Sequence, residues 1–402
     1  MSLTGALAAI NFFEADVEGG LGPFLATWLA GAAKWQPEQV GLVMTVTGLV
    51  GLVFNAPAGA LVDRLGRPRM LMGVATALIV VGTLALIPAR HLGAVLSSQF
   101  GVAAGAALIP PALTALTLGL VGKDVFPAQQ GRNQAWNHAG NVVASVAIAW
   151  LAGQEAGLAT FFVFAGMAVA SGLSLLLIRR GDFNQERARG TPALKTEASI
   201  WFLLRDRRLL LLCLALTLFH LGNAAMLPLL GQRIAKFGNG NATRWLAICV
   251  IVAQFAMVIV ATVASWAASR IRRTWLFVIP CCVLPVRGVM AAFGWSVEWL
   301  IPIQILDACG AGLLGVSVPI LIADYTWGSG HTQAALGTAN TFQGIGAALS
   351  NIVGGVLVQE MGWSWAFLGL TAPSLVALTI AFWLHRVDGA TSAPTAVALA
   401  RH

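Results

Sequence analysis

The stretch that decides the fold reads Gly59-Ala60-Leu61-Val62-Asp63-Arg64-Leu65-Gly66-Arg67-Pro68-Arg69. It separates two long apolar runs, 38–62 and 70–89, and it is short and basic. Glycine and proline mark turns, and positive charge collects on the cytoplasmic side of membrane proteins. The stretch therefore predicts a tight cytoplasmic turn between two membrane-spanning helices.

The composition of the whole chain points to a membrane protein. Apolar residues make up 58% of the 402 residues, charged residues only 10%, and the mean hydropathy is +0.80. A soluble protein would carry about 25% charged residues. The apolar runs are continuous and long enough to cross about 30 Å of hydrocarbon, which indicates helices rather than a barrel.

Twelve such runs predict twelve transmembrane helices, with both termini on one side. Of the 24 lysines and arginines, 18 fall in the segments on the side of the termini and five on the opposite side, so both termini are predicted to be cytoplasmic. This distribution also explains the net charge of +8 without a nucleic-acid partner. The predicted spans are 4–30, 38–62, 70–89, 92–121, 132–154, 157–178, 209–231, 243–268, 274–294, 297–325, 332–358 and 362–384.

The segment 179–208 is the longest polar stretch and divides the spans into six and six. We expect an N-terminal bundle over 1–178, a cytoplasmic linker over 179–208 that includes a short surface helix, and a C-terminal bundle over 209–402. Prolines recur at similar places in the first and seventh spans and in the fourth and tenth. Two repeats that enclose a site at mid-membrane are typical of transporters.

The pattern Gly-x-x-x-Asp-Arg-x-Gly-Arg-x-Arg, in the second loop of a twelve-span chain, resembles the signature loop of the major facilitator superfamily (MFS) of secondary transporters. The resemblance implies an all-α fold of two pseudo-symmetric six-helix bundles, a central cavity and a monomer. It also implies that Asp63, Arg64 and Arg67 latch the outward-facing state. Asp63 can meet the positive N-terminus of another helix, and Asp124, at the end of the fourth span, is the expected partner of Arg67.

Three acids interrupt the first span, at Glu14, Asp16 and Glu18. Ionisable groups at membrane depth are costly and face a cavity or a partner. Burial raises the pKa of a carboxyl group toward neutrality, which suits a proton carrier. Glu14 and Asp16 are therefore the predicted proton-coupling residues. The alternative is a broken or late-starting span that leaves these acids nearer water.

Polar residues also concentrate in spans five, seven and eleven, which the resemblance places at or beside the cavity. Asn133, Asn137 and Asn141 recur at helical spacing. Cavity lining and hydrogen bonding between helices are equally good interpretations of such a stripe. The predicted substrate contacts are Asn133, Asn137, His138, Asn141, His220, Asn223, Asn340 and Gln343.

Arg287 and Asp307 lie in neighbouring spans at nearly equal depth. Either charge alone would be very costly within the membrane, so we expect a buried ion pair. The pair is either structural or a second coupling site.

Motifs of enzymes and of metal sites are absent from the sequence. It has no GxxxxGK[ST], HExxH or GxSxG, and the GxGxxG at 310–315 lies inside an apolar run with no strand before it. The five cysteines show no metal-ligand spacing. We therefore expect no enzyme, no cofactor and no metal.

The predicted function is proton-coupled transport of a small organic solute across a bacterial inner membrane, with export preferred. The acidic first span resembles proton-coupled multidrug exporters, although a basic residue early in span four and a Gly-Pro motif in span five, usual in those exporters, are absent. Charge at this site suits a cationic or zwitterionic solute. The alternatives are a proton-coupled metabolite importer and a receptor without transport.

Overall fold

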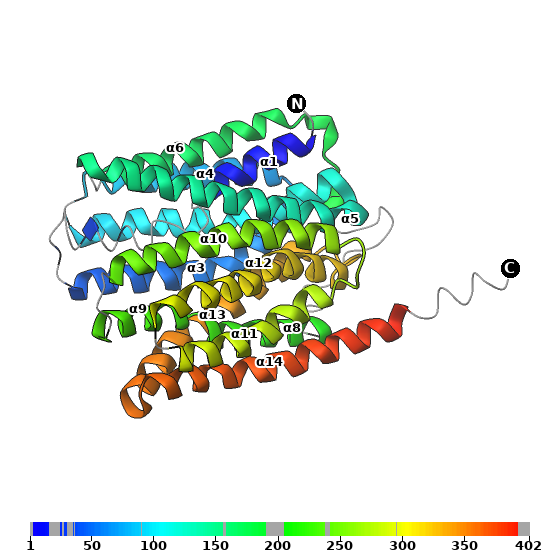
Figure 1. Ribbon diagram of the computed structural model, residues 1–402. Helices are drawn as coiled ribbons and strands as arrows, with labels where there is room; N and C mark the ends of the chain where they lie inside the picture. The colour runs from blue at the N-terminus through cyan, green and yellow to red at the C-terminus, as the bar shows by residue number, and fades with distance from the viewer. Residues whose placement is uncertain are drawn as a thin grey trace. The chain divides into compact units, whose positions relative to one another are not determined.

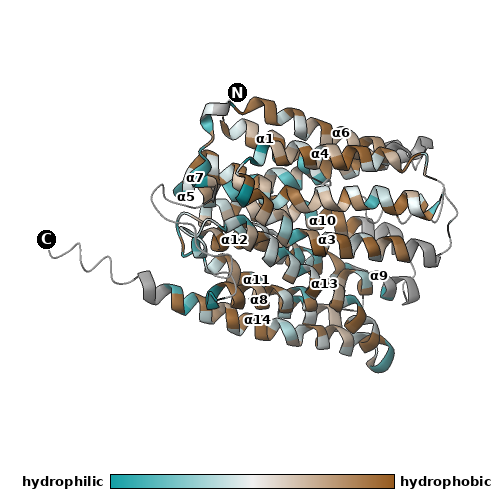
Figure 2. Cartoon of the chain, turned by 180° about the vertical axis from the view of Figure 1, so that it is seen from behind, coloured by the Kyte–Doolittle hydropathy of each residue, from teal (hydrophilic) through white to brown (hydrophobic). Residues whose placement is uncertain are grey.

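The computed structural model is almost entirely helical, with no strand among the residues that it describes. In that part of the chain, ten helical stretches are long and apolar enough to cross a membrane (Figure 2). One of the ten, Leu92–Ile148, holds the fourth predicted span and most of the fifth. The first span is described only as a short apolar helix. The described residues are 3–15, 25, 28–29, 35, 37–89, 91–155, 158–189, 205–237, 242–294 and 296–392.

The order of the elements confirms the predicted all-α membrane fold (Figure 1). Most long helices overlap one predicted span each, whereas α5 overlaps two, and α8 and α9 together overlap the seventh. The longer helices are α1 (Leu3–Glu14), α3 (Pro37–Leu65), α4 (Pro68–Ala85), α5 (Leu92–Glu155), α6 (Leu158–Ser174), α8 (Arg207–Asn223), α9 (Met226–Phe237), α10 (Ala242–Ala267), α11 (Trp275–Phe293), α12 (Leu300–Tyr325), α13 (Thr332–Met361) and α14 (Trp363–Ser392). The short elements are η1 (Leu175–Leu177), η2 (Arg180–Asp182), α7 (Gln185–Arg189) and η4 (Val297–Trp299).

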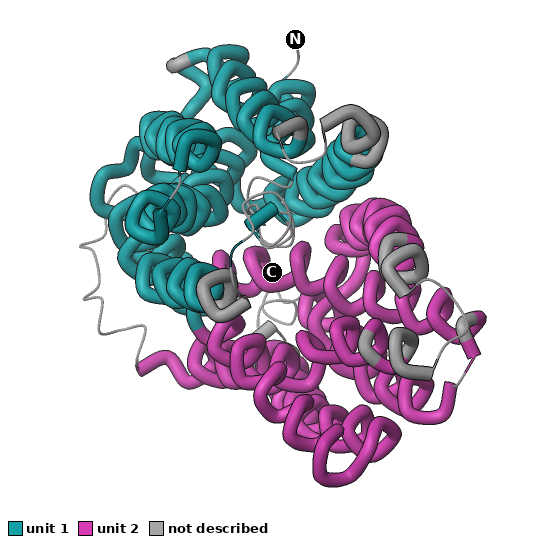
Figure 3. Tube along the Cα trace, turned by 90° about the vertical axis from the view of Figure 1, so that its left-hand side faces the viewer, with its two compact units in different colours: residues 1–199, 326–341 teal, residues 200–325, 342–402 magenta. Residues whose placement is uncertain are grey.

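The chain forms two compact units (Figure 3). The first unit comprises residues 1–199 and 326–341, and the second comprises 200–325 and 342–402. Helix α13 therefore begins in the first unit and continues in the second. The predicted bundles, 1–178 and 209–402 with a linker between them, stay a prediction.

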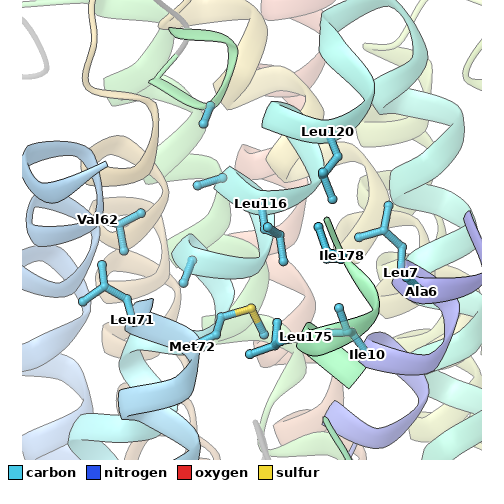
Figure 4. Packing of buried hydrophobic residues seen from close by; sticks show 13 residues of the cluster. Ala6, Leu7, Ile10, Val62, Leu71, Met72, Leu116, Leu120, Leu175 and Ile178 are labelled. Atoms are coloured by element: carbon cyan, nitrogen blue, oxygen red, sulfur yellow. The ribbon is translucent and has the colours of Figure 1, made fainter. Parts of the chain in front are cut away.

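The turn that the sequence predicted between the second and third spans joins α3 to α4. Gly66 has φ +59°, a left-handed conformation that suits glycine and ends α3. Pro68 is the first residue of α4, where its missing N–H costs nothing. On either side of the turn, Val62 and Met72 are buried in an apolar cluster with side chains of α1 and α5 (Figure 4). This core fixes the turn in the first unit.

The predicted spans leave a loop over 122–131 between the fourth and fifth helices, and this prediction is wrong. Residues 122–131 are helical, and only Gly122, with φ +76° and ψ +170°, departs from helical geometry within α5. A single glycine is enough to break the helix, because it reaches this conformation without steric cost. The polar residues after it, which suggested a loop, form the start of the next helical segment.

The seventh predicted span, 209–231, is not one continuous helix. Helix α8 starts where the Asp206 carboxylate accepts hydrogen bonds from the N–H groups of Arg208 and Leu209, at 2.8 and 3.2 Å. It ends at Asn223, and α9 begins at Met226. At the break, the Ala225 N–H donates to Ser350 Oγ at 2.9 Å. A side chain thus replaces the helical acceptor that the break removes.

The described part of the predicted linker contains the expected short helix. Helix α7 is capped by Asn184, whose Oδ1 accepts a hydrogen bond from the Arg187 N–H at 2.9 Å. The Asn184 N–H in turn donates to the Gly119 carbonyl of α5 at 3.1 Å. Ala188 is buried with the cluster of Figure 4, so α7 packs on the first unit.

Candidate functional site

Asp63 lies at the last turn of α3 and is nearly buried, with 5% of its surface exposed. Its Oδ2 accepts a hydrogen bond from the Ala334 N–H at 2.7 Å. Ala334 is in the first turn of α13, where N–H groups lack helical acceptors and the helix dipole is positive. Within the first unit, the carboxylate therefore caps the beginning of α13.

The backbones of α3 and α13 approach each other closely beside this cap. A Cβ added at Gly59 would clash with the Gln333 carbonyl, and one added at Gly337 would clash with the Asn55 carbonyl. The two glycines lie on opposite helices and both face the partner backbone. Any larger residue at either position has to push the helices apart, because a carbonyl oxygen cannot rotate away as a side chain can.

The arginines of the loop do not share this burial. Arg64 and Arg67 are exposed, whereas Arg69 donates from Nη2 to the Leu175 carbonyl at 3.0 Å. The expected ion pair between Arg67 and Asp124 is absent from the described residues, and Asp124 is exposed. Asp124 follows the break at Gly122 on an exposed face of α5, and its role in gating stays a prediction.

The residue next to Asp124 does make a contact on this side of the first unit. The Lys123 ammonium lies 4.7 Å from the centre of the Trp327 ring, a cation–π distance. Trp327 belongs to the segment 326–341 that packs in the first unit. The turn between the fourth and fifth spans is thus in contact with the turn that precedes α13, through lysine and tryptophan rather than through an ion pair.

Glu14 ends α1 and is 1% exposed. The Ser171 hydroxyl of α6 donates a hydrogen bond to Glu14 Oε2. Close packing of α1 against α5 surrounds this carboxyl, since a Cβ added at Gly140 would clash with the Phe12 carbonyl. Glu14 is therefore buried in the first unit, at the end of a helix that starts at Leu3, and its role in proton coupling stays a prediction. Asp16 and Glu18 lie outside the described residues.

Asn133 is buried in the interior of α5, with 1% of its surface exposed. Its Oδ1 accepts from Gln129 Nε2 at 2.8 Å, and its Nδ2 donates to Thr117 Oγ1 at 3.0 Å. Thr117 precedes the break at Gly122, so the amide joins the two halves of α5. Both ends of the side chain are in use, which favours packing over substrate binding for Asn133.

We expect Asn133→Ala to lower the stability of the protein by about 1–3 kcal/mol, because two buried polar partners lose their hydrogen bonds. The midpoint of thermal unfolding of the purified protein measures this loss. Asn137→Ala is the matched control, since Asn137 is partly exposed and its amide oxygen accepts one long hydrogen bond, from Asn141 Nδ2 at 3.3 Å. Equal midpoints for the two variants would contradict the packing role.

The remaining predicted substrate contacts keep some exposure. Asn137, His138 and Asn141 on α5 are partly exposed, as are Asn340 and Gln343 on α13. Asn340 belongs to the first unit and Gln343 to the second. His220 and Asn223 are partly exposed on α8. Their role in substrate binding stays a prediction.

Arg287 of α11 and Asp307 of α12 form the expected ion pair in the second unit. Arg287 Nη1 is 2.9 Å from Asp307 Oδ1, and the side chains are 1% and 15% exposed. Asn223 joins them, since its Oδ1 accepts from Arg287 and its Nδ2 lies 3.4 Å from Asp307 Oδ1. Asn223, a predicted substrate contact on α8, therefore belongs to the same polar cluster as the ion pair.

Three residues that contact the predicted site residues were not predicted from the sequence. They are Ser171, Thr117 and Gln304. In an apolar span, the sequence around a single serine or threonine does not show whether its side chain hydrogen-bonds to another helix or only fills space. Gln304 could have been found, because it lies three residues before Asp307 and so shares a helix face with it. In the structure Gln304 Oε1 is 3.3 Å from Arg287 Nη2.

Apolar helices long enough to span a membrane, with charged groups buried among them, indicate a multi-pass membrane protein. The chain belongs to the Major Facilitator Superfamily, whose family profile matches residues 7–326. An uncharacterized MFS-type transporter of Mycobacterium tuberculosis, found in two strains, is 37% identical over 374 residues, which covers 91% of this chain and 89% of the relative.

Solved structures of the same superfamily share the fold. The transporter FucP in the outward conformation matches with TM-score 0.72 and 16% identity, over 95% of this chain and 98% of that one. The human organic anion transporter MFSD10 matches with TM-score 0.70 and 15% identity, over 94% and 97%. The proton:xylose symporter XylE matches with TM-score 0.71 and 13% identity, over 94% of each. At these identities the likeness shows the fold alone.

Proposed function

We propose that this MFS protein moves a small organic solute across the bacterial cytoplasmic membrane by alternating access, coupled to protons that Glu14 and Asp16 carry. The observation that carries the proposal is the burial of Glu14. Its carboxyl is 1% exposed and accepts a hydrogen bond from Ser171. Burial at membrane depth favours the neutral form of a carboxyl group, so Glu14 can load and release one proton in each cycle.

Asp63, Arg64 and Arg67 are proposed to act on the conformational cycle. The contact between Asp63 and the start of α13 is a charge-to-helix cap that can form in one state and break in another. Arg64 and Arg67, exposed beside it, support the same latch from the predicted cytoplasmic side. The contact of Lys123 with the Trp327 ring adds a second interaction to this latch. Asp124, exposed beside Lys123, is proposed to pair with Arg67 in another state of the cycle.

Export is the proposed direction, on the resemblance of the acidic first span to proton-coupled exporters. FucP and XylE are described as proton symporters, and MFSD10 as an organic anion transporter. Those words apply to those proteins, and coupling to protons comes to this chain as a proposal. Resistance of cells that express the protein to toxic solutes would support export, whereas accumulation of a metabolite would support import.

Flux into liposomes tests the proposed function. The purified protein is reconstituted with a trapped pH dye, a pH gradient is imposed, and a panel of organic cations, zwitterions and anions is added. We expect at least one solute to move protons in protein-containing liposomes and not in empty ones. Solute movement without a proton signal would make the protein a facilitator, and binding without movement would make it a receptor.

A further inference from the structure

A cluster of polar side chains in the second unit is more than the ion pair that the sequence predicted. Arg287 of α11 and Gln304 of α12 are 1% and 0% exposed, whereas Asp307 and Asn223 are partly exposed. Asn223 is the last residue of α8, directly before the break that precedes α9. Broken helices at membrane depth are where transporters place their ligand sites, because the break frees polar groups.

The hydrogen bonds of the cluster leave two buried donors unused. Arg287 gives Nη1 to Asp307 and Asn223, and Nη2 to Gln304 Oε1. Because arginine only donates, the oxygen of Gln304 must face it and the Gln304 amide nitrogen must face away. Neither Gln304 Nε2 nor Arg287 Nε has an acceptor in the described structure. Buried donors are nearly always paired, so two together indicate an acceptor that the chain does not supply.

The exposed side of the same cluster offers acceptors. Asp307 uses Oδ1 for Arg287 and Asn223, and the described residues give Oδ2 no partner. His220, one turn before Asn223, holds its Nδ1 2.9 Å from the Leu216 carbonyl. A carbonyl only accepts, so Nδ1 carries the proton and Nε2 of the neutral ring is an acceptor. The cluster therefore combines two open donors with two open acceptors.

The location adds a second argument. Arg287 lies six residues before the end of α11, and Asp307 lies seven residues after the start of α12. At 1.5 Å per residue, both charges lie about 9–11 Å inside the helices. Charged groups at such depth are expensive and mark function more often than stability. The charges of Arg287 and Asp307 cancel, so a ligand that fits must bring no net charge.

We propose that this cluster is a binding subsite for an amino-acid-like zwitterion. The ligand carboxylate accepts hydrogen bonds from Arg287 Nε and Gln304 Nε2, and its ammonium group donates to Asp307 Oδ2 and His220 Nε2. A cation alone leaves the donors unpaired, and an anion alone adds a negative charge beside Asp307. The proposal rests on the proposed function only in treating the ligand as a transported solute.

The midpoint of thermal unfolding of the purified full-length protein, measured with and without ligand, tests the subsite. The first set of probes is L-phenylalanine, its amide, which lacks the carboxylate, and its N-acetyl derivative, which lacks the ammonium group. Alanine and its two corresponding analogues form the second set. We expect a zwitterion to raise the midpoint by about 2–4 °C at saturation, and its two analogues to raise it less. A full response to an analogue, or none to either zwitterion, overturns the proposal.

The variant Gln304→Met tests whether the rise in unfolding midpoint comes from binding at this cluster. Methionine fills the volume of glutamine but removes the donor, so we expect the apparent affinity for the zwitterion to fall at least about tenfold while the protein stays folded. Gln99→Met is the matched control in the first unit, since Gln99 is also buried and its Nε2 also lacks an acceptor. Equal affinities in the two variants would place binding elsewhere and overturn the subsite.

The two measurements separate this proposal from the proposed function. Zwitterion binding that depends on Gln304, without flux in liposomes, would support the subsite and favour a receptor over a transporter. Flux without such binding would support the proposed transport function and reject the subsite. A lower midpoint of Gln304→Met without ligand, together with no response of the wild type to any probe, would show that the cluster only stabilises the fold.

Discussion

Replacement of Glu14 by glutamine is expected to reduce solute-driven proton movement to the level of empty liposomes. Glutamine has the shape of glutamic acid and can still accept the hydrogen bond from Ser171. It cannot take up or release a proton at any accessible pH. The fold should survive, because the side chain is 1% exposed and a neutral amide is cheaper to bury than a carboxylate.

The measurement is the pH-dye signal in liposomes, with Glu360→Gln as the matched control. Glu360 is an exposed acid near the end of α13, so the same chemical change there should leave the signal intact. Exchange of solute across the membrane without a pH gradient should persist in Glu14→Gln. An unchanged proton signal in Glu14→Gln would reject Glu14 as the carrier and leave Asp16→Asn as the next variant to examine.

The second large effect is expected from Gly59→Val. A Cβ at this position clashes with the backbone carbonyl of Gln333, so the approach of α3 to the start of α13 becomes strained. Overpacking of this kind costs about 1–3 kcal/mol. If the contact belongs to one state of the transport cycle, that cost shifts the population away from this state by roughly five- to 150-fold.

Labelling of a reporter cysteine measures the shift. Ala334→Cys places a thiol at the first turn of α13, at a position that is 2% exposed. Its reaction with a membrane-impermeant thiol reagent should accelerate in the Gly59→Val background in proportion to the open population. Gly51→Val is the matched control on the same helix, because a Cβ there has nothing within 4 Å. Equal labelling rates in the two backgrounds would show that the contact does not open during the cycle.

Asp63→Asn should act in the same direction with a smaller effect. Asparagine keeps an oxygen that can accept from the Ala334 N–H, but it loses the charge that interacts with the N-terminus of α13. Such interactions contribute about 0.3–2 kcal/mol. The labelling rate of Ala334→Cys should therefore rise by roughly two- to 30-fold. No rise would mean that the close backbone packing alone holds the start of α13.

The sequence by itself determined the helical membrane fold, the positions of most spans and the turn at Gly66-Arg67-Pro68. These features depend on local properties: apolar runs of sufficient length, and glycine and proline at a helix boundary. The sequence also found the pair Arg287 and Asp307, because two opposite charges at equal depth in neighbouring spans leave few other partners.

Local properties failed where a break depends on one residue. The loop predicted over 122–131 is helix, because a single left-handed glycine ends one helix and the next begins at once. The seventh span breaks at 224–225, where Ser350, 125 residues away, supplies the acceptor. Neither feature changes the hydropathy of the segment, so a count of apolar residues cannot detect it.

Only the tertiary structure decided which polar groups meet. Glu14 reaches Ser171 across 157 residues, and Asp63 reaches Ala334 across 271. Arg67 and Asp124, close in the predicted topology, do not pair. The physical reason is that hydropathy fixes how deep a residue lies, whereas the rotation and neighbours of each helix fix its partner, and these follow from the packing of all the helices in the unit.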